Sequence, residues 1–115
     1  MTILDYEIDV MRSDERNMVL KDWMLNTRHD RKDIERCMRD GVVLVARARN
    51  GIALGWLAHV GRKACAAYVK GAYRDLGVLR ALWDRAGRPS EVMHPSTARA
   101  HQVMRGLMSS REETR

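Results

Sequence analysis

The sequence predicts an α+β (mixed α/β) fold in which helices cover a mostly antiparallel sheet. Three observations predict it. Five short segments show the alternating or continuous apolar pattern of strands, and four others carry apolar residues at helical spacing. The pair Asn50-Gly51 joins two of the strand segments as a hairpin. The expected order of elements is β-α-α-β-β-β-α-β-α.

The first segments combine one strand with two helices. Alternation of apolar and acidic residues from Tyr6 to Val10 predicts a half-buried strand. Ser13 is expected to cap the first helix, with acidic residues in its first turn. A second helix is expected to begin at Asp30 and to end at Gly41.

The central strands follow one another along the chain. Residues 42–46 form an apolar run, Asn50-Gly51 turns the chain, and residues 52–58 return. A second turn over residues 61–63 leads into an apolar strand over residues 64–69. Three consecutive antiparallel strands are therefore expected.

The last segments alternate helix, strand and helix. An apolar stripe predicts a helix from Gly77, and Gly87 and Pro89 end it. Residues 91–94 are expected to form a short strand, and Pro95-Ser96 to open a final helix. One domain over residues 1–108 is the default for this length, with a charged tail over 109–115.

Composition limits the classes of protein that fit. The longest aliphatic run, residues 42–46, is far shorter than the roughly 20 residues that a membrane span needs. The N-terminus lacks the pattern of a signal peptide. Cys37 and Cys65 have neither metal-ligand spacing nor the pattern of a disulfide framework. We therefore expect a cytoplasmic protein without a metal site.

Positive charge is concentrated in the second half of the chain. Residues 61–108 hold nine Arg or Lys side chains against three acidic ones, which accounts for the whole net charge of +6. Such a half suits an anionic partner: a phosphorylated cofactor, nucleic acid or an acidic protein face. The alternative is a basic surface that only keeps the protein soluble.

A strand–turn–helix unit lies inside this basic half. The strand over residues 64–69 leads into a turn containing Arg74-Asp75-Leu76-Gly77, and the predicted helix follows at once. Free main-chain N–H groups and the positive end of a helix dipole meet at such a turn. An anion, most simply a phosphate, fits there.

With this turn, the order of elements resembles the GNAT superfamily of acyl-CoA-dependent N-acyltransferases. The signature of that superfamily is Arg/Gln-x-x-Gly-x-Gly/Ala, and this chain has Arg74 and Gly77 in place but Leu79 at the last position. A weaker match lies in the last predicted helix, where Ala98 and Gly106 are kept. Pro95 and Gln102 replace the usual asparagine and tyrosine.

The resemblance implies that acetyl-CoA or another acyl-CoA is the cofactor. Its pyrophosphate would bind the main chain over residues 74–80, and its pantetheine arm would pair with the edge of the preceding strand. The short strand over residues 91–94 would splay away to open the slot. Leu79 could either crowd the phosphates or point into the core. The implied cofactor-binding residues are Tyr68, Val69, Arg74, Gly77, Val78, Leu79 and Arg80.

The resemblance also implies transfer of an acetyl group to an amine of an unknown acceptor. Gln102 stands where the superfamily places its tyrosine, and it cannot act as a general acid. The candidate substitutes are His94, His101, His59 and Tyr68, and a histidine titrates near neutrality. Cys65 is expected to be a core residue and not a nucleophile, and the three tryptophans are expected to anchor the core.

Two alternatives follow from the absence of a predicted final hairpin after Leu107. A second copy of the chain could complete the acceptor site, which predicts a homodimer. Alternatively, the chain is a catalytically inactive GNAT-like binding or assembly protein, of a size that would suit a phage product. Its basic face would then contact nucleic acid or an acidic protein. A plain nucleic-acid-binding module is disfavoured because no known motif is present.

Overall fold

The computed structural model describes residues 5–73, 77–93 and 106–107. The strands are Tyr6–Val10 (β1), Val42–Ala48 (β2), Ala53–Val60 (β3), Lys63–Val69 (β4) and Glu91–Val92 (β5). The helices are Arg16–Asn26 (α1), Arg31–Asp40 (α2) and Val78–Arg85 (α3). Single 3-10 turns span Ser13–Glu15 (η1) and Gly71–Tyr73 (η2).

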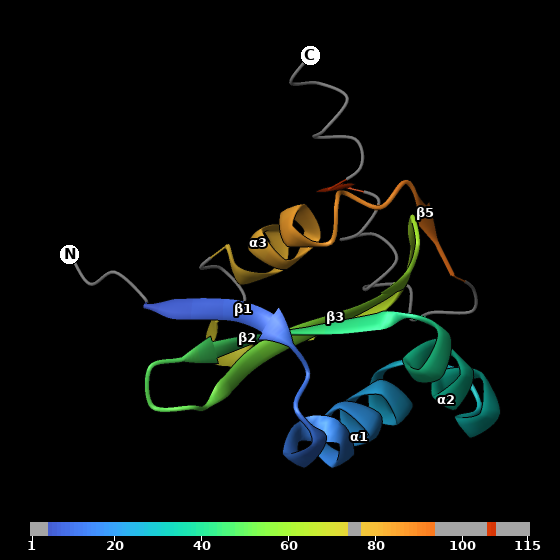
Figure 1. The fold of residues 1–115 in the computed structure, drawn as a ribbon, viewed down its shortest axis with the longest axis horizontal. Coiled ribbons are helices and arrows are strands. Elements are labelled where there is room, and N and C mark those ends of the chain that lie inside the picture. Colours follow the sequence, from blue (N-terminus) through green and yellow to red (C-terminus); the bar gives the residue numbers. More distant parts are fainter. Residues whose placement is uncertain (1–4, 74–76, 94–105, 108–115) are drawn as a thin grey trace.

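The strands form one sheet in the order β1-β2-β3-β4-β5. The pairings are antiparallel from β1 to β4, and β5 joins β4 in parallel. Figure 1 shows α1 and α2 on one face of the sheet and α3 on the other. The predicted α+β fold with a mostly antiparallel sheet is therefore confirmed.

Each face of the sheet has its own core. Trp23 of α1 stacks on Trp56 of β3 at a ring-centroid distance of 5.4 Å, on the face covered by α1 and α2. Leu82 and Trp83 of α3 pack on the opposite face. All three tryptophans are at most 2% exposed, so their predicted role as core anchors is confirmed.

The predicted cap at Ser13 is wrong, and the reason is Glu15. The Arg12 N–H donates to Glu15 Oε1 at 2.7 Å, so Arg12 precedes η1 as its cap. The same carboxylate accepts two hydrogen bonds of 2.6 Å from Arg47, which is 4% exposed in β2. These hydrogen bonds lower the pKa of Glu15. The carboxylate therefore closes the turn and neutralises a buried guanidinium.

Other predicted boundaries hold closely. The Asp30 side chain accepts from the Asp33 N–H and caps α2, and Gly41 ends that helix. Gly51, at φ 88°, turns the β2–β3 hairpin. Lys63 belongs to β4, although a turn was predicted there, because it pairs with Val60 across the hairpin.

The end of the chain is only partly described. The strand predicted over 91–94 appears as Glu91–Val92, and residue 94 lies outside the described residues. Of the final helix predicted from residue 95, only residues 106 and 107 are described, and both are helical. None of the helices in the described ranges is both long and apolar enough to cross a membrane.

Candidate functional site

The strands β4 and β5 pair over a short stretch. β5 pairs with Lys63 and Ala64 of β4, and the Met93 N–H donates to the Ala64 carbonyl at 2.8 Å. Within the described residues, the pairing does not continue to Cys65, Ala66 or Ala67. In this part of the chain, the edge of β4 beyond Ala64 therefore has no neighbouring strand.

A bulge in β4 lies next to the last residue that pairs with β5. His59 pairs with Ala64 and the preceding Ala58 pairs with Ala66, so Cys65 is an extra residue on β4. Cys65 and Ala66 both pack on the face covered by α1 and α2. A bulge of this kind bends its strand and increases the local twist.

Along the chain, β4 is followed by η2 and then by α3. Gly77 precedes this helix in the left-handed conformation, at φ 76°, and its carbonyl accepts the first helical hydrogen bond from Ala81. In the described part of the chain, the N–H groups of Gly77, Val78 and Leu79 have no hydrogen-bond partner. The first turn carries no acidic residue. Donors and the positive end of the helix dipole are thus available to an anion.

The Leu79 side chain does not project freely over the N–H groups at the start of α3. It is half-buried and packs against the α3 core together with the fully buried Val78. Of the two orientations that the sequence allowed, the structure therefore shows the one toward the core.

The other predicted cofactor-binding residues are divided between the two faces of the sheet. Val69 belongs to the α3 core, with Val78 and Leu79. Tyr68 lies opposite Trp56 and packs on the α1–α2 face. Arg80 is exposed on α3. The remaining site residues from the sequence, Arg74, His94, His101 and Gln102, lie outside the described residues.

A cavity of about 320 Å³ lies between α2 and the paired residues of β4 and β5. Its lining includes Cys37 and Asp40 of α2, Cys65 of β4 and Met93 after β5. Burial and a hydrogen bond with Cys37 raise the pKa of Cys65 to about 12. The prediction that Cys65 is a core residue is confirmed by its exposed fraction of 1%.

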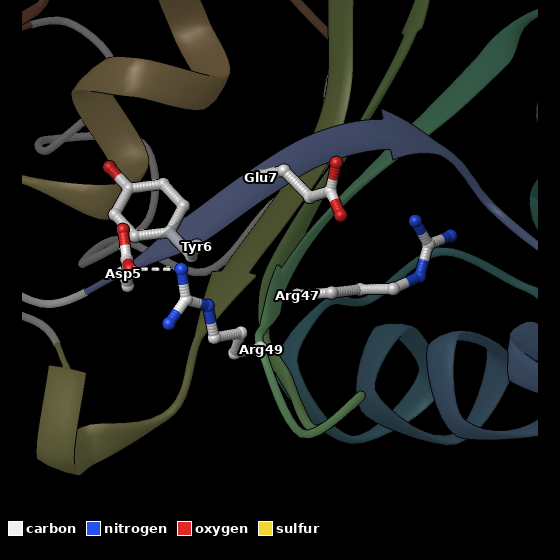
Figure 2. Close-up of a pocket in the computed structure, with 5 residues that line it drawn as sticks. All are labelled: Asp5, Tyr6, Glu7, Arg47 and Arg49. Atoms are coloured by element: carbon white, nitrogen blue, oxygen red, sulfur yellow. Dashed lines mark ion pairs between the residues drawn. The ribbon is translucent and has the colours of Figure 1, made fainter.

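Two other features were not predicted from the sequence. His29 is buried between α1 and α2, and its Nδ1 accepts a 2.8 Å hydrogen bond from Trp23 Nε1. Arg47 lines a second cavity, of about 180 Å³, beside β1. Figure 2 shows its guanidinium pointing away from the exposed pair formed by Arg49 and Asp5. The hydrogen bonds from Arg47 to Glu15 join residues 32 positions apart, which no local spacing reveals.

Comparison with solved structures places this arrangement among known folds. The chain superposes on AAC(6')-Iy with a TM-score of 0.62 and 16% identity, covering 90% of this chain and 89% of that one. It superposes on a ribosomal-protein-alanine N-acetyltransferase from Brucella melitensis biovar Abortus 2308 with a TM-score of 0.62, 16% identity, and coverage of 92% and 90%. A GNAT-family acetyltransferase from Staphylococcus aureus Mu50 matches with a TM-score of 0.55, 18% identity, and coverage of 71% and 63%.

The chain has the GNAT fold. No family model matches the sequence, and no curated protein does. At identities of 18% or less, the three structures show the GNAT fold and nothing finer. The resemblance seen in the order of elements is thus confirmed in three dimensions.

Gly77 offers a direct test of the turn before α3 in this GNAT fold. We expect Gly77→Ala to lower the free energy of unfolding by about 1 to 2 kcal/mol, because an L-residue is strained at φ 76°. No atom lies within 4 Å of an added Cβ, so the cost is one of backbone conformation. Chemical denaturation measures it.

Gly71 provides the matched control. Its added Cβ also meets open space, and its φ is not positive. Gly71→Ala should therefore be neutral or slightly stabilising. Equal losses from both substitutions would show that the left-handed turn at Gly77 does not matter.

Proposed function

We propose that this chain binds a CoA thioester in the slot between β4 and β5 and transfers the acetyl group to an amine. One observation carries the proposal: within the described residues the pairing of β4 with β5 ends at Ala64, and β4 is followed along the chain by α3, whose first N–H groups have no partner there. The similar AAC(6')-Iy has been solved with CoA and with a CoA-based bisubstrate analogue. The shared fold supports the same type of donor here.

The pyrophosphate of CoA would bind at the first turn of α3. The N–H groups of Gly77, Val78 and Leu79 would donate to its oxygens, since no partner in the described residues occupies them. Arg74 and Arg80 would add positive charge. Charge-assisted hydrogen bonds of this kind are stronger than neutral ones.

The pantetheine arm would lie along β4. The Lys70 N–H donates to the Leu54 carbonyl of β3 at 3.0 Å. Because main-chain groups alternate sides along a strand, Ala67 turns its N–H and carbonyl away from β3 and toward the slot. An amide-containing arm would pair with them as an added strand does. Tyr68 and Val69 would flank this path on opposite faces of the sheet.

The reaction needs groups that move protons. The amine nitrogen attacks the thioester carbonyl, a C–N bond forms, the C–S bond breaks, and the amine loses a proton while the thiolate gains one. We assign the proton transfers to His94 and His101 and assign to Gln102 a hydrogen bond to the reacting groups. These three roles rest on the resemblance and are tested by alanine substitution of each residue.

Thermal unfolding with and without CoA tests the binding step. A ligand at about 100 times its dissociation constant should stabilise the fold by about 2.7 kcal/mol. Arg74→Ala should weaken this shift and leave the unliganded stability unchanged. Arg39→Ala is the control, because Arg39 is 71% exposed and forms an ion pair with its neighbour Asp40 on α2. No shift for the wild type at millimolar CoA would overturn the proposal.

Mass spectrometry of amines incubated with acetyl-CoA tests the chemical step. A product heavier by one acetyl group, lost in His94→Ala or His101→Ala, is the expected result. A CoA-dependent stability shift without transfer to any amine would instead support a catalytically inactive binding protein. Salt-sensitive binding to DNA or to an acidic protein would then identify its partner.

A further inference from the structure

Three sulfur-bearing side chains from distant parts of the sequence line the 320 Å³ cavity. The Cys37 Sγ lies 3.6 Å from the Met93 Sδ. The Cys65 thiol lies close enough to Cys37 for the two side chains to interact. All three side chains line the cavity, so a small ion entering it would reach them together.

The fold fixes each of these residues from a different element. Cys37 is 8% exposed on the buried side of α2, and its carbonyl accepts the N–H of Gly41 that ends the helix. Cys65 is the bulged residue of β4. The hydrogen bond from the Met93 N–H to Ala64 holds Met93 beside that bulge. The three donors are thus positioned by the backbone and not by flexible loops.

We propose that Cys37, Cys65 and Met93 form a binding site for a soft monovalent metal ion, Cu(I). Thiolate and thioether sulfurs are the ligands that select Cu(I). With metal–sulfur bonds of about 2.3 Å, three sulfurs in a trigonal set lie about 4 Å apart. The distance between the Cys37 and Met93 sulfurs, 3.6 Å, is close to this value. In the described residues, no three His, Cys, Asp or Glu side chains form a metal-binding group. The third donor is therefore the thioether, which favours Cu(I) over zinc.

The charged side chains that line the cavity complement the net charge of the site with Cu(I) bound. Cu(I) replaces two thiol protons, which pass to solvent, and the site of one cation and two thiolates carries one net negative charge. The lining has one more cationic than anionic side chain: Arg36, Arg62 and Lys63 against Asp40 and Glu91. This excess offsets the charge of the site.

Uptake of the metal should depend on pH. A cysteine thiol must lose its proton to bind a metal ion as a thiolate. Binding should then release protons and become tighter as the pH rises. The carboxylates and cations facing the thiols are the five charged lining residues just named.

An anaerobic competition titration tests the site. The reduced full-length chain is titrated with Cu(I) in the presence of a chromogenic Cu(I) chelator, and we expect one ion per chain with two protons released. Cys37→Ala and Cys65→Ala should each weaken binding by more than about 100-fold, and Met93→Leu by about 10-fold. Met38→Leu is the control, because Met38 packs against the same core and does not line the cavity.

X-ray absorption on the loaded protein provides a second readout. Three sulfur neighbours at about 2.3 Å are expected, falling to two in Met93→Leu. The proposed Cu(I) site is overturned if the wild type takes Cu(I) from the chelator no better than Cys65→Ala does. It is also overturned if the X-ray absorption spectrum of the loaded protein shows no sulfur neighbours. Circular dichroism verifies that each variant is folded. If an alanine variant does not fold, the X-ray absorption spectrum of the Cu(I)-loaded wild type alone decides whether sulfur atoms bind the metal.

Discussion

Replacing Arg47 with methionine is expected to lower the free energy of unfolding by about 3 to 5 kcal/mol. The Arg47 guanidinium is buried and donates two hydrogen bonds to Glu15 and one, of 2.8 Å, to the Val10 carbonyl. Its removal leaves a carboxylate that is 12% exposed without its cation. Such an uncompensated charge is costly because water cannot reach it freely. Chemical denaturation of both proteins measures the loss.

Arg49 is the matched control in the same cavity wall. Figure 2 shows it paired with Asp5 at the open side, where the two side chains are 89% and 72% exposed. An exposed pair of this kind contributes about 0 to 1 kcal/mol. Arg49→Met should therefore have little effect, and an equal loss from both substitutions would contradict the assignment of Arg47 to the core.

The pH dependence of stability provides a further check on this pair. Hydrogen bonds from Arg47 hold the pKa of Glu15 below its ordinary value of 4.5. A carboxyl whose folded-state pKa is lowered stabilises the fold above the ordinary value, and this contribution is lost as the pH falls through the lowered one. Wild-type stability should therefore fall more steeply below about pH 4.5 than that of Glu15→Gln.

Trp56→Ala is the second large expected effect, a loss of about 3 to 5 kcal/mol. The Trp56 side chain is 1% exposed, stacks on Trp23 and lies opposite Tyr68 of β4. Truncation removes the contact that joins α1 to the strands beside the slot. Thermal and chemical unfolding measure the loss, and weaker CoA binding is expected to accompany it.

A more conservative change separates packing from hydrogen bonding. Trp56 Nε1 donates to Asp22 Oδ2 at 3.2 Å. Trp56→Phe keeps an aromatic ring but removes this bond, and Asp22→Asn keeps an acceptor. Trp56→Phe should therefore cost less than Trp56→Ala, and Asp22→Asn less still. If Trp56→Ala were as stable as Trp56→Phe, the stacking of Trp56 on Trp23 would contribute nothing to the free energy of unfolding.

Local sequence signals predicted the parts of the fold that depend on near neighbours. Asn50-Gly51 and Gly77 mark turns because few other residues adopt their backbone conformations, and both turns are observed. Asp30 caps α2 as predicted, since a cap depends on residues three positions apart. The prediction failed at Ser13 because a distant arginine, Arg47, fixes Glu15.

The candidate site could be predicted only in part. The turn before α3 was visible in the sequence because Arg74, Gly77 and Arg80 lie within one short segment. The catalytic assignments to His94, His101 and Gln102 stay predictions, since they lie outside the described residues. The parting of β4 and β5 implied by the resemblance stays a prediction, since the chain beyond residue 93 lies outside the described residues. The bulge at Cys65 was not predicted, because a bulge depends on the register with β3.

The sequence by itself determined the order of strands and helices, the turns and the basic second half, because periodicity, turn residues and charge are local properties. Only the tertiary structure decided which side chains meet. It brought Cys37 and Cys65 together from spacings that predict no site, and it buried Arg47 against Glu15. Contacts between distant segments arise from strand register and from the packing of helices on a sheet, and no short stretch of sequence encodes them.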